Sequence, residues 1–366
     1  MKLNLVNIVD NVGPVNFGIW NASISQWDEL SCQHNILSYL LFPKGQSLPS
    51  ELQALNAFEL ERDAIRTFQR LAAKFNWTPQ NTLVATHGCW RLPTKVGHAL
   101  RQKGYRWLYC PHGMLEPWPL RQKYIRKRIA LALWEKPMAM QADCIRAVSM
   151  PERENLFFLF ENHENIVHLP NSIPQAFFDG RIAKPSTTCN FTFLGRLHHK
   201  KSPYETALAF SSLLPKPSSC QLVLAGPDQG EAKRIRELAA TSNQDIQVPG
   251  PVFGDSKRAL LQRTHFFILA SKSEGMPTSV IEAMACGCIP IVTRECNLPE
   301  LLDHELAIEV RSTVDSIQAG LRAAITLPRL ERERLAKANS AFASSKYSSS
   351  VVAADYATLI KTILEI

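Results

Sequence analysis

Apolar and polar positions alternate regularly along the chain, with short apolar runs separated by longer amphipathic stretches. In the first half, apolar runs of the length of a buried parallel strand occur at residues 3–9, 36–42, 83–85, 105–110 and 145–149. The second half repeats the pattern at residues 190–194, 222–225, 246–248, 266–270 and 289–292. Because strands that alternate with helices form parallel sheets covered by helices, the sequence predicts an α/β protein. We expect two doubly wound, Rossmann-like domains that face each other across a cleft.

The length of the chain also indicates two domains, because 366 residues exceed what a single hydrophobic core usually supports. We place an N-terminal domain at residues 1–172 and a C-terminal domain at residues 173–345. A helical segment at residues 346–366 is expected to pack back on the N-terminal domain. The polar stretch at residues 184–188 is the best candidate for a linker.

The most informative stretch, at residues 264–293, combines a strand, a polar loop and a helix. The predicted helix spans residues 278–286, and Pro277 suits its first position, where a missing N–H costs nothing. The N–H groups near Thr278 and Ser279 have no acceptor within the helix. They therefore form an anion site at the carboxyl end of a strand.

Two carboxylates bracket this anion site: Glu274 on the loop and Glu282 one turn inside the helix. Since a carboxylate repels phosphate, both glutamates are better partners for hydroxyl groups that the phosphate carries. A sugar nucleotide has a hydroxylated ring at each end of a diphosphate. Gly195, Arg196 and Lys201 follow the first strand of the second half, and the two cations suit the diphosphate itself. The sequence therefore predicts a nucleotide-sugar site in the C-terminal domain.

Composition narrows the classes of function. The net charge of +8 could serve nucleic acid, a membrane surface or an anionic small molecule. Nucleic acid is disfavoured as a partner, because the sequence has no helix-turn-helix, zinc-finger or aromatic-plus-basic strand pattern. The nine cysteines form no CxxC pair, and the ten histidines form no ligand cluster with carboxylates. We therefore expect reduced thiols and no metal site.

No apolar run approaches the roughly 20 residues that span a bilayer, and residues 1–6 read as a first strand, not a signal peptide. We expect a cytoplasmic protein. A basic segment at residues 120–136 leaves two interpretations open. Its Arg and Lys side chains form either a solvated helix face or a contact with anionic lipid head groups at the inner face of the membrane. On a helical wheel Ile125, Ile129 and Ala132 share the other face.

Three loops of the first half are candidates for substrate contact. The loop at residues 10–18 contains Gly13 and precedes a helical segment at residues 19–30. It is either an ordinary strand–helix turn or a phosphate loop. Two His-Gly pairs, at His87 and His112, each close an apolar strand at the sheet end where open α/β folds bind ligands. Their equivalent positions favour a functional role for His112, while the role of His87 stays open.

These motifs together resemble the retaining GT-B glycosyltransferases of family 4, the group 1 type. The resemblance rests on Gly195-Arg196 with Lys201, on residues 224–226 and 250–252, and above all on Ser273-Glu274-Gly275-Met276-Pro277 with Glu282-Ala283-Met284-Ala285-Cys286-Gly287. Residues 86–90 and 111–118 are similar to the acceptor-side segments of bacterial members that build polysaccharides. The resemblance covers nearly the whole chain and is stronger after Asn171.

The resemblance implies retaining transfer of a sugar from a UDP- or GDP-sugar to a glycan acceptor, which would be lipid-linked. The pathway would be the synthesis of cell-surface polysaccharide or lipopolysaccharide. The enzyme would be peripheral at the cytoplasmic membrane face and would need neither a metal nor another cofactor. A diphosphate oxygen of the donor itself would help to deprotonate the acceptor, and no residue stands out as a covalent nucleophile.

The resemblance also implies roles for single residues. Glu282 would bind the ribose hydroxyls, and Glu274 would bind the transferred sugar together with the backbone of Gly275, Met276, Pro277 and Thr278, with Ser279 next to it. Arg196 and Lys201 would stabilise the leaving nucleoside diphosphate. His112 would lie against the sugar near the reacting carbon, and Gly13 would let the first loop approach the diphosphate. The backbone around Val252 would bind the base.

The sequence departs from the family pattern at several places. Ser172 and Ser202 stand where glycines are usual, and the loop around Gly13 lacks the common double glycine. Relatives often have arginine at the position of His112, which leaves the role of this residue open. Two other functions remain as alternatives. One is a relative that acts on the nucleotide-sugar alone, such as a 2-epimerase, which would need a different set of carboxylates and histidines. The other is a non-catalytic nucleotide-sugar-binding protein.

Overall fold

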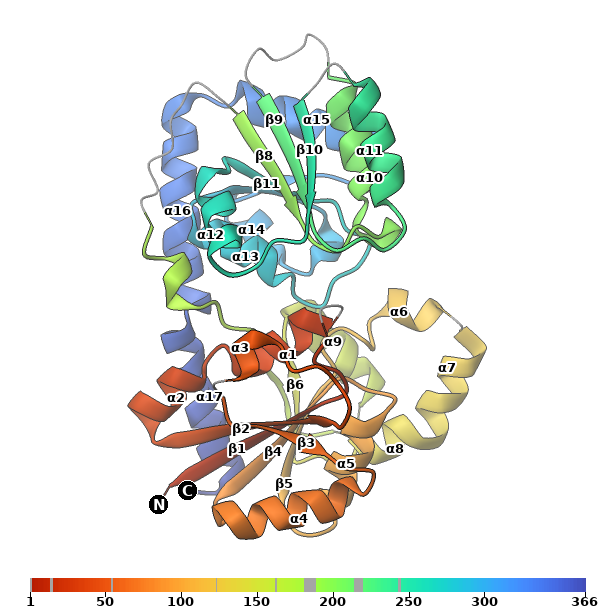
Figure 1. Cartoon of the computed structure of the whole chain (residues 1–366), viewed down its shortest axis with the longest axis vertical. Coiled ribbons are helices and arrows are strands. Elements are labelled where there is room, and N and C mark those ends of the chain that lie inside the picture. Colours follow the sequence, from red (N-terminus) through yellow and green to blue (C-terminus); the bar gives the residue numbers. More distant parts are fainter. Residues whose placement is uncertain are drawn as a thin grey trace. The chain divides into compact units, whose positions relative to one another are not determined.

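The computed structural model describes residues 2–13, 16–53, 55–122, 124–161, 163–180, 189–213, 220–242 and 245–366. The chain divides into two compact units, one formed by Met1–Ser172 with Ser349–Ile366 and the other by Ile173–Ser348. Each unit contains one parallel sheet covered by helices, which confirms the two predicted Rossmann-like folds (Figure 1). The expected linker at residues 184–188 lies outside the described residues.

The sheet of the first unit has seven strands in the order β3-β2-β1-β4-β5-β6-β7. They are β1 (Leu3–Val9), β2 (Ile36–Pro43), β3 (Ala57–Leu60), β4 (Thr82–His87), β5 (Arg106–Cys110), β6 (Cys144–Ala147) and β7 (Ile166–His168). Strands β1 and β4 are buried along their whole length, because they lie side by side at the centre of the sheet. The order of the strands reverses between these two, so the loops that follow them lie at the switch point where such folds bind ligands.

Helices cover this sheet, and their ends follow local sequence signals. The helices are α1 (Phe17–Ile24), α2 (Trp27–His34), α3 (Ser50–Gln53), α4 (Ala64–Phe75), α5 (Leu92–Arg101), α6 (Pro117–Arg121), α7 (Tyr124–Ala130), η2 (Leu131–Glu135), α8 (Lys136–Ala139), α9 (Met150–Leu159) and α17 (Ser349–Leu364). Helix α4 starts after Asp63, whose carboxylate accepts the N–H of Arg66 at 2.9 Å. It ends at Asn76, which has the left-handed conformation typical of a helix end.

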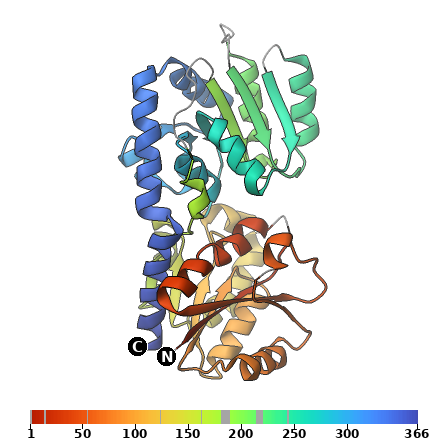
Figure 2. The same cartoon turned by 60° about the vertical axis from the view of Figure 1, so that its left-hand side comes forward.

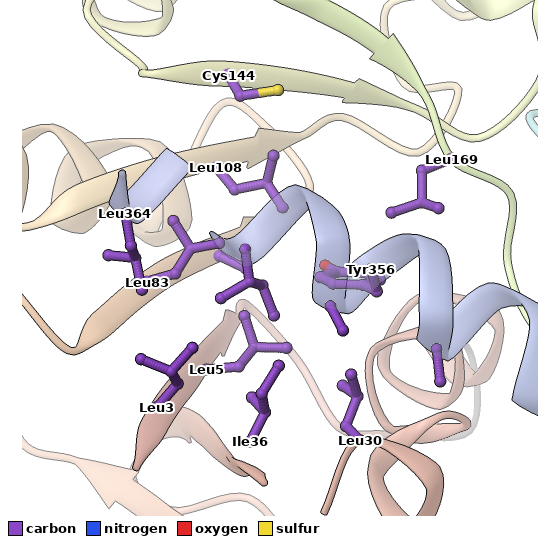
Figure 3. Close-up of a cluster of buried hydrophobic side chains, with 14 of the residues drawn as sticks. Leu3, Leu5, Leu30, Ile36, Leu83, Leu108, Cys144, Leu169, Tyr356 and Leu364 are labelled. Atoms are coloured by element: carbon purple, nitrogen blue, oxygen red, sulfur yellow. The ribbon is translucent and has the colours of Figure 1, made fainter. Parts of the chain in front are cut away.

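Helix α17 belongs to the first unit, although it follows the whole second unit in the sequence. Its buried face includes Tyr356 and Leu364 and packs on a cluster that contains Leu5 of β1 and Leu108 of β5 (Figure 3). The ring of Tyr356 also lies 5.3 Å from the buried guanidinium of Arg146. Figure 2 shows α17 running alongside this sheet. The core of the first unit is therefore built from segments far apart in the sequence.

The sheet of the second unit has six strands in the order β10-β9-β8-β11-β12-β13. They are β8 (Cys189–Leu194), β9 (Cys220–Ala225), β10 (Asp245–Gly250), β11 (Phe266–Leu269), β12 (Ile289–Val292) and β13 (Ile308–Glu309). The helical elements are η3 (Gln175–Phe177), η4 (His199–Lys201), α10 (Pro203–Ser211), α11 (Ala232–Thr241), α12 (Gly254–Arg263), α13 (Thr278–Ala285), η5 (Arg294–Cys296), α14 (Pro299–Asp303), α15 (Val314–Thr326) and α16 (Arg329–Tyr347). Here the order of the strands reverses between β8 and β11.

Two helix predictions need correction. The helix expected at residues 19–30 is in fact the two helices α1 and α2, which meet at Ser25 and Gln26. At this break the carbonyl of Ser23 accepts a hydrogen bond from the indole of Trp27 at 2.7 Å, which satisfies a carbonyl in the last turn of α1. In the second unit, Pro277 is the N-cap of α13 and not its first helical residue.

The basic segment at residues 120–136 is also not one amphipathic helix. It is divided among α6, α7 and the π-helical turn η2, which lie to one side of the sheet in Figure 1. The apolar face predicted from Ile125, Ile129 and Ala132 is exposed. The segment is instead held to the first unit by the buried carboxylate of Glu135. This carboxylate accepts hydrogen bonds from the backbone N–H of Trp90 and the hydroxyls of Thr94 and Tyr109, at 2.7–3.0 Å.

Candidate functional site

The second unit gathers most of the predicted site residues at one end of its sheet. The loop after β8 carries Gly195, Arg196 and Lys201, and the loop after β11 carries Glu274 and leads into α13. Since β8 and β11 are neighbours at the switch point of this sheet, the two loops are brought together there. The sequence could predict each loop, but only the strand order shows that they are adjacent.

Close backbone packing shapes the loop after β8. A Cβ atom on Gly226 would lie only 1.8 Å from the carbonyl oxygen of Gly195, so only glycine fits there. The N–H of Leu197 donates to the carbonyl of Pro227 at 2.8 Å, which ties the loops after β8 and β9 together. Arg196 is half-buried and donates to the Gln229 side chain at 3.1 Å. These contacts restrain the guanidinium at the carboxyl end of the sheet.

Lys201 and Glu274 form an ion pair with 2.6 Å between Nζ and Oε1, and only 13% and 12% of the two side chains are exposed. Burial alone would raise the pKa of Glu274. The charges of Lys201 and Lys200, with hydrogen bonds from Lys201 and Ser271, outweigh this and hold the pKa below its usual range. Glu274 is therefore a carboxylate at neutral pH. Its backbone is fixed as well, because the Asn297 side chain donates to its carbonyl at 2.8 Å.

The first turn of α13 begins four residues after Glu274 and has unused hydrogen-bond donors. The N–H groups of Thr278 and Ser279 have no acceptor among the described residues, and the side chain of Pro277 makes no capping hydrogen bond. Gly275 is half-buried and Met276 is buried just before this turn. The loops after β8 and β11 thus bring two cations, one carboxylate and a helix N-terminus to the same end of the sheet. This combination can bind an anion through its cations and N–H groups, and a hydroxyl group through Glu274.

Glu282 lies inside α13 and has a partner that the sequence did not reveal. Its Oε1 accepts from Nζ of Lys257 on α12 at 2.7 Å, with 10% of the lysine and 4% of the glutamate side chain exposed. The ammonium of Lys257 also lies 5.2 Å from the ring centre of Phe177. The two charged residues are 25 positions apart, and no local pattern in the sequence links them.

The remaining predicted residues are divided between the units. Val252 is half-buried just before α12 in the second unit, and Gly13 lies in the first unit after β1. The N–H of Gly13 donates to the Asn11 side chain at 2.6 Å, and its carbonyl accepts from the indole of Trp20 at 3.3 Å. Gly13 therefore has an internal structural role in its own loop.

The first unit has a pocket of about 570 Å³ at the switch point of its own sheet. Side chains of the loops after β1 and β4 and of α7 and η2 line it, including Asp10, Asn11, His87, Trp90, Lys127 and Trp134. Trp90 and His112 both have positive φ angles, 76° and 53°, which non-glycine residues rarely adopt. Backbone strain of this kind is concentrated at functional sites.

His112 contacts the other histidine that the sequence singled out. Its Nε2 lies 2.8 Å from Nδ1 of His87, and Nε2 of His87 lies 2.9 Å from Oδ1 of Asn7. The backbone of the same loop is held by the buried carboxylate of Glu152, which accepts the N–H groups of Gly113 and Val148. Burial raises the pKa of Glu152 to about 7. The two His-Gly pairs of the sequence thus mark two histidines in direct contact.

Potential metal ligands do not gather in the described ranges of the chain, where no three His, Cys, Asp or Glu side chains form a group that could hold a metal ion. All nine cysteines are free thiols. Among the described residues, no helix is both long and apolar enough to cross a membrane.

Comparison with known proteins defines the class. Residues 175–341 match the family model described as glycosyl transferases group 1. Among solved structures, the Anabaena protein HepE in complex with UDP and glucose superimposes with a TM-score of 0.76 at 13% identity, covering 98% of this chain and 100% of that one. A glycosyltransferase from Rickettsia africae gives a TM-score of 0.78 at 16% identity, with 100% and 99% of the chains covered. Sucrose-phosphate synthase from Thermosynechococcus elongatus gives 0.75 at 17% identity, with both chains fully covered.

The chain therefore has the GT-B fold, and residues 175–341 of its second unit match the glycosyl transferases group 1 model. Curated relatives match over shorter parts of the chain. The chain is 23% identical over 268 residues to a phosphatidylinositol N-acetylglucosaminyltransferase subunit of Arabidopsis thaliana, covering 69% of this chain and 57% of that protein. It is 30% identical over 104 residues to GDP-mannose:cellobiosyl-diphosphopolyprenol alpha-mannosyltransferase of Xanthomonas oryzae, or 28% and 27% of the two chains. The chain thus spans little more than half the length of the first relative. The predicted family and fold are confirmed.

Proposed function

We propose that this protein is a metal-independent retaining glycosyltransferase that moves a sugar from a UDP- or GDP-sugar to a lipid-linked glycan, in the synthesis of cell-surface polysaccharide or lipopolysaccharide. One observation carries the proposal most directly. The ion pair of Lys201 and Glu274, 2.6 Å apart, lies at the switch point of the second sheet with Arg196 and the unused N–H groups of α13. A ligand that satisfies all of these groups needs both an anionic part and a hydroxylated part, as a sugar diphosphate has.

In this proposal the second unit holds the donor. Arg196, Lys201 and the N–H groups of Thr278 and Ser279 bind the diphosphate, and they stabilise the negative charge that grows on it as the sugar leaves. Glu274 accepts a hydroxyl of the transferred sugar through the oxygen that Lys201 does not hold. Lys201 then contacts the diphosphate on one side and Glu274 on the other, which orients the diphosphate relative to the transferred sugar.

Glu282 is proposed to bind the ribose. Lys257 engages its Oε1, and no described residue hydrogen-bonds to its Oε2, which leaves that oxygen for ribose hydroxyls. The backbone near Val252 is proposed to contact the base. The chemistry needs few further groups. The acceptor hydroxyl attacks the anomeric carbon on the face from which the diphosphate leaves, and a diphosphate oxygen takes its proton.

The first unit is proposed to bind the acceptor and an anionic membrane surface. Five large apolar side chains from α7 and η2 are 40–73% exposed: Tyr124, Ile125, Ile129, Leu133 and Trp134. Arg126 and Lys127 stand among them and also line the pocket of this unit. Exposed apolar side chains mixed with cations are typical of segments that lie in the interface of an anionic bilayer. A peripheral position at the cytoplasmic face of the membrane would bring a lipid-linked acceptor to this pocket.

The test of the reaction uses the whole chain with UDP- and GDP-sugars and a lipid-linked glycan acceptor. We expect a product whose new bond has the anomeric configuration of the donor, formed equally well with a chelator present. An inverted product contradicts the retaining mechanism. A free epimerised sugar nucleotide supports a 2-epimerase, and binding without turnover supports a binding protein. A thermal-shift screen with UDP, GDP and their sugars first identifies the base.

Single substitutions test the donor site. Arg196→Ala should lower turnover by about two to three orders of magnitude, since removal of one transition-state donor costs roughly 3–4 kcal/mol. Glu282→Ala should chiefly weaken the binding of the nucleoside diphosphate, measured by calorimetry. Arg334→Ala, which removes an exposed arginine paired with Glu331 on α16, is the matched control. If Glu282→Ala leaves the affinity unchanged, its ribose role is wrong.

Vesicle sedimentation tests the membrane surface. The protein should bind vesicles that contain phosphatidylglycerol, and a double charge reversal at Arg126 and Lys127 should release it. Ile125→Asp should also weaken binding, because a buried methylene contributes about 0.8 kcal/mol. Leu330→Asp, at a side chain that is 79% exposed in the second unit, is the control for an added carboxylate. Binding that survives the charge reversal would show that the cations are only a solvated face.

A further inference from the structure

Three polar side chains of the first unit form a hydrogen-bonded chain that ends at the predicted site residue His112. Asn7 lies on β1, His87 is the last residue of β4, and His112 follows β5. The distances along this chain are 2.9 Å from Asn7 Oδ1 to His87 Nε2 and 2.8 Å from His87 Nδ1 to His112 Nε2. Asn7 and His87 are at most 1% exposed, so water does not compete for these contacts.

The position of each proton in this series of hydrogen bonds follows from the orientation of the Asn7 amide. The amide of Asn7 donates its Nδ2–H to the backbone carbonyl of Tyr39 at 3.2 Å, so its Oδ1 must face His87. An amide oxygen can only accept, and Nε2 of His87 therefore carries a hydrogen. If His87 is neutral, its Nδ1 is bare and must accept the Nε2–H of His112. If His112 is neutral too, its Nδ1 is left as an acceptor.

The surroundings keep both rings neutral. Burial, assisted by the charge of Arg146, lowers the pKa of His87 to about 3. Burial, with His87 and Arg146, holds the pKa of His112 well below its ordinary value. Arg146 cannot move away from the rings, because its guanidinium donates to the carbonyls of Leu169 and Pro170. It is a fixed positive charge that disfavours protonation of either imidazole ring.

We propose that His87 is a positioning residue that holds His112 in its Nε2–H tautomer, so that Nδ1 of His112 accepts a hydrogen bond from a substrate hydroxyl. No described residue hydrogen-bonds to Nδ1 of His112, and the residue is partly exposed. The unusual backbone of His112 is fixed as well, through Gly113 and Glu152. Both the ring orientation and its acceptor atom are thus set before a ligand binds. The identity of the hydroxyl-bearing substrate rests on the proposed function, whereas the tautomer does not.

The direct test is histidine ¹⁵N NMR of the whole protein, with His87→Asn and His112→Asn used to assign the two rings. We expect both rings to remain neutral and protonated at Nε2 from pH 8 to about pH 5. A His112 signal with the proton at Nδ1, or a charged ring in this range, overturns the proposal. This measurement needs no substrate, so it stands if no donor is turned over, and that result would count against the proposed function alone.

Asn7→Asp should reverse the direction of the hydrogen bond between His87 and His112. A carboxylate at this position favours a charged His87, whose Nδ1–H would then donate to His112 and shift the His112 proton to Nδ1. The NMR signal of His112 should change tautomer in this variant as His87 becomes protonated. An unchanged His112 tautomer beside a protonated His87 would show that His87 does not set it, and would refute the proposal.

Kinetics separate positioning from mere packing. His87→Asn keeps an acceptor near the place of Nδ1, whereas His87→Leu fills similar space without one. We expect His87→Leu to lower kcat/KM roughly 10- to 100-fold, as for a lost hydrogen bond, and His87→Asn to restore most of it. In the double variant with His112→Leu, loss of His87 should cost nothing more, because it acts through His112. Equal losses for the two His87 variants, or additive losses in the double variant, would mean that His87 only packs.

Discussion

The pair of Lys257 and Glu282 offers the sharpest test of how the second unit is held together. Their charged atoms are 2.7 Å apart, and only 10% and 4% of the side chains are exposed. Lys257→Met keeps the length of the side chain and its contact with the Phe177 ring, but leaves a buried carboxylate without a cation. Removing one partner of a buried pair costs about 3–5 kcal/mol of unfolding free energy, because the remaining charge is uncompensated.

The two units can be followed separately in the same experiment. All seven tryptophans lie in the first unit, at positions before residue 135, so tryptophan fluorescence reports on that unit alone. Far-UV circular dichroism reports on both units. In a urea titration, Lys257→Met should move the dichroism transition of the second unit to lower urea. The fluorescence transition should stay where it is.

Two controls make the outcome decisive. Arg329→Met removes a cation from the exposed pair with Glu333 on α16, where the side chains are 68% and 50% exposed, and should cost no more than about 0.5 kcal/mol. Lys257→Met combined with Glu282→Gln should recover much of the loss, because no buried charge is left unpaired. If Lys257→Met costs no more than Arg329→Met, or if it moves the fluorescence transition alone, the reasoning from the buried pair is refuted.

The remaining predictions concern the stability of the first unit and nucleotide binding by the second. Tyr356→Ala should remove about 3–5 kcal/mol from the stability of the first unit, read by fluorescence, and a loss under 1 kcal/mol would contradict the core assignment of α17. The pKa of His87 is about 3 in the folded protein, against about 6.5 in the unfolded chain, so only the unfolded chain is protonated at this ring between these two pH values. As the pH is lowered through this window, the free energy of unfolding should therefore fall by up to ~1.4 kcal/mol per pH unit for each buried imidazole. The pKa of Glu152 is about 7 in the folded protein, so this group adds stability as the pH is lowered from about 7 to 4.5 and offsets part of the loss from the histidines. Glu152→Gln should therefore make stability fall more steeply with decreasing pH, and an unchanged slope would contradict the raised pKa of Glu152. Gly226→Ala should abolish nucleotide binding in the thermal-shift assay, whereas the same change at Gly18, which has open space around its Cβ position, should not.

Much of the fold could be predicted, because the signals for it are local. The apolar runs marked the positions of most of the strands, and the Glu274–Glu282 stretch identified α13 and the loop before it. Helix boundaries were less certain where a side chain takes a backbone acceptor, as Trp27 does at the break between α1 and α2. The helical wheel misplaced Ile125, since the segment is anchored by the buried Glu135 and not by its apolar face.

The candidate site was predicted residue by residue, but its pairings were not. Gly195, Arg196 and Lys201 were assigned to the same site as Glu274, and the structure brings the two loops together. Lys257 could not be linked to Glu282, because this contact depends on how α12 packs beside α13. The hydrogen bond between His87 and Asn7 depends likewise on β1 and β4 being neighbours in the sheet. Contacts of this kind depend on how strands and helices pack together, which cannot be predicted from a single sequence.

Helix α17 has a consequence for the order in which the protein is made. A ribosome completes the strands of the first unit early and then the whole of the second unit before it reaches Ser349. Until then the apolar surface around Leu5 and Leu108 lacks the helix that covers it. The second unit has its full sequence earlier and can fold first, reversing the usual N-terminal-first order of domains. A nascent chain stopped before α17 would thus expose an uncovered sheet face, which is the natural target of a chaperone.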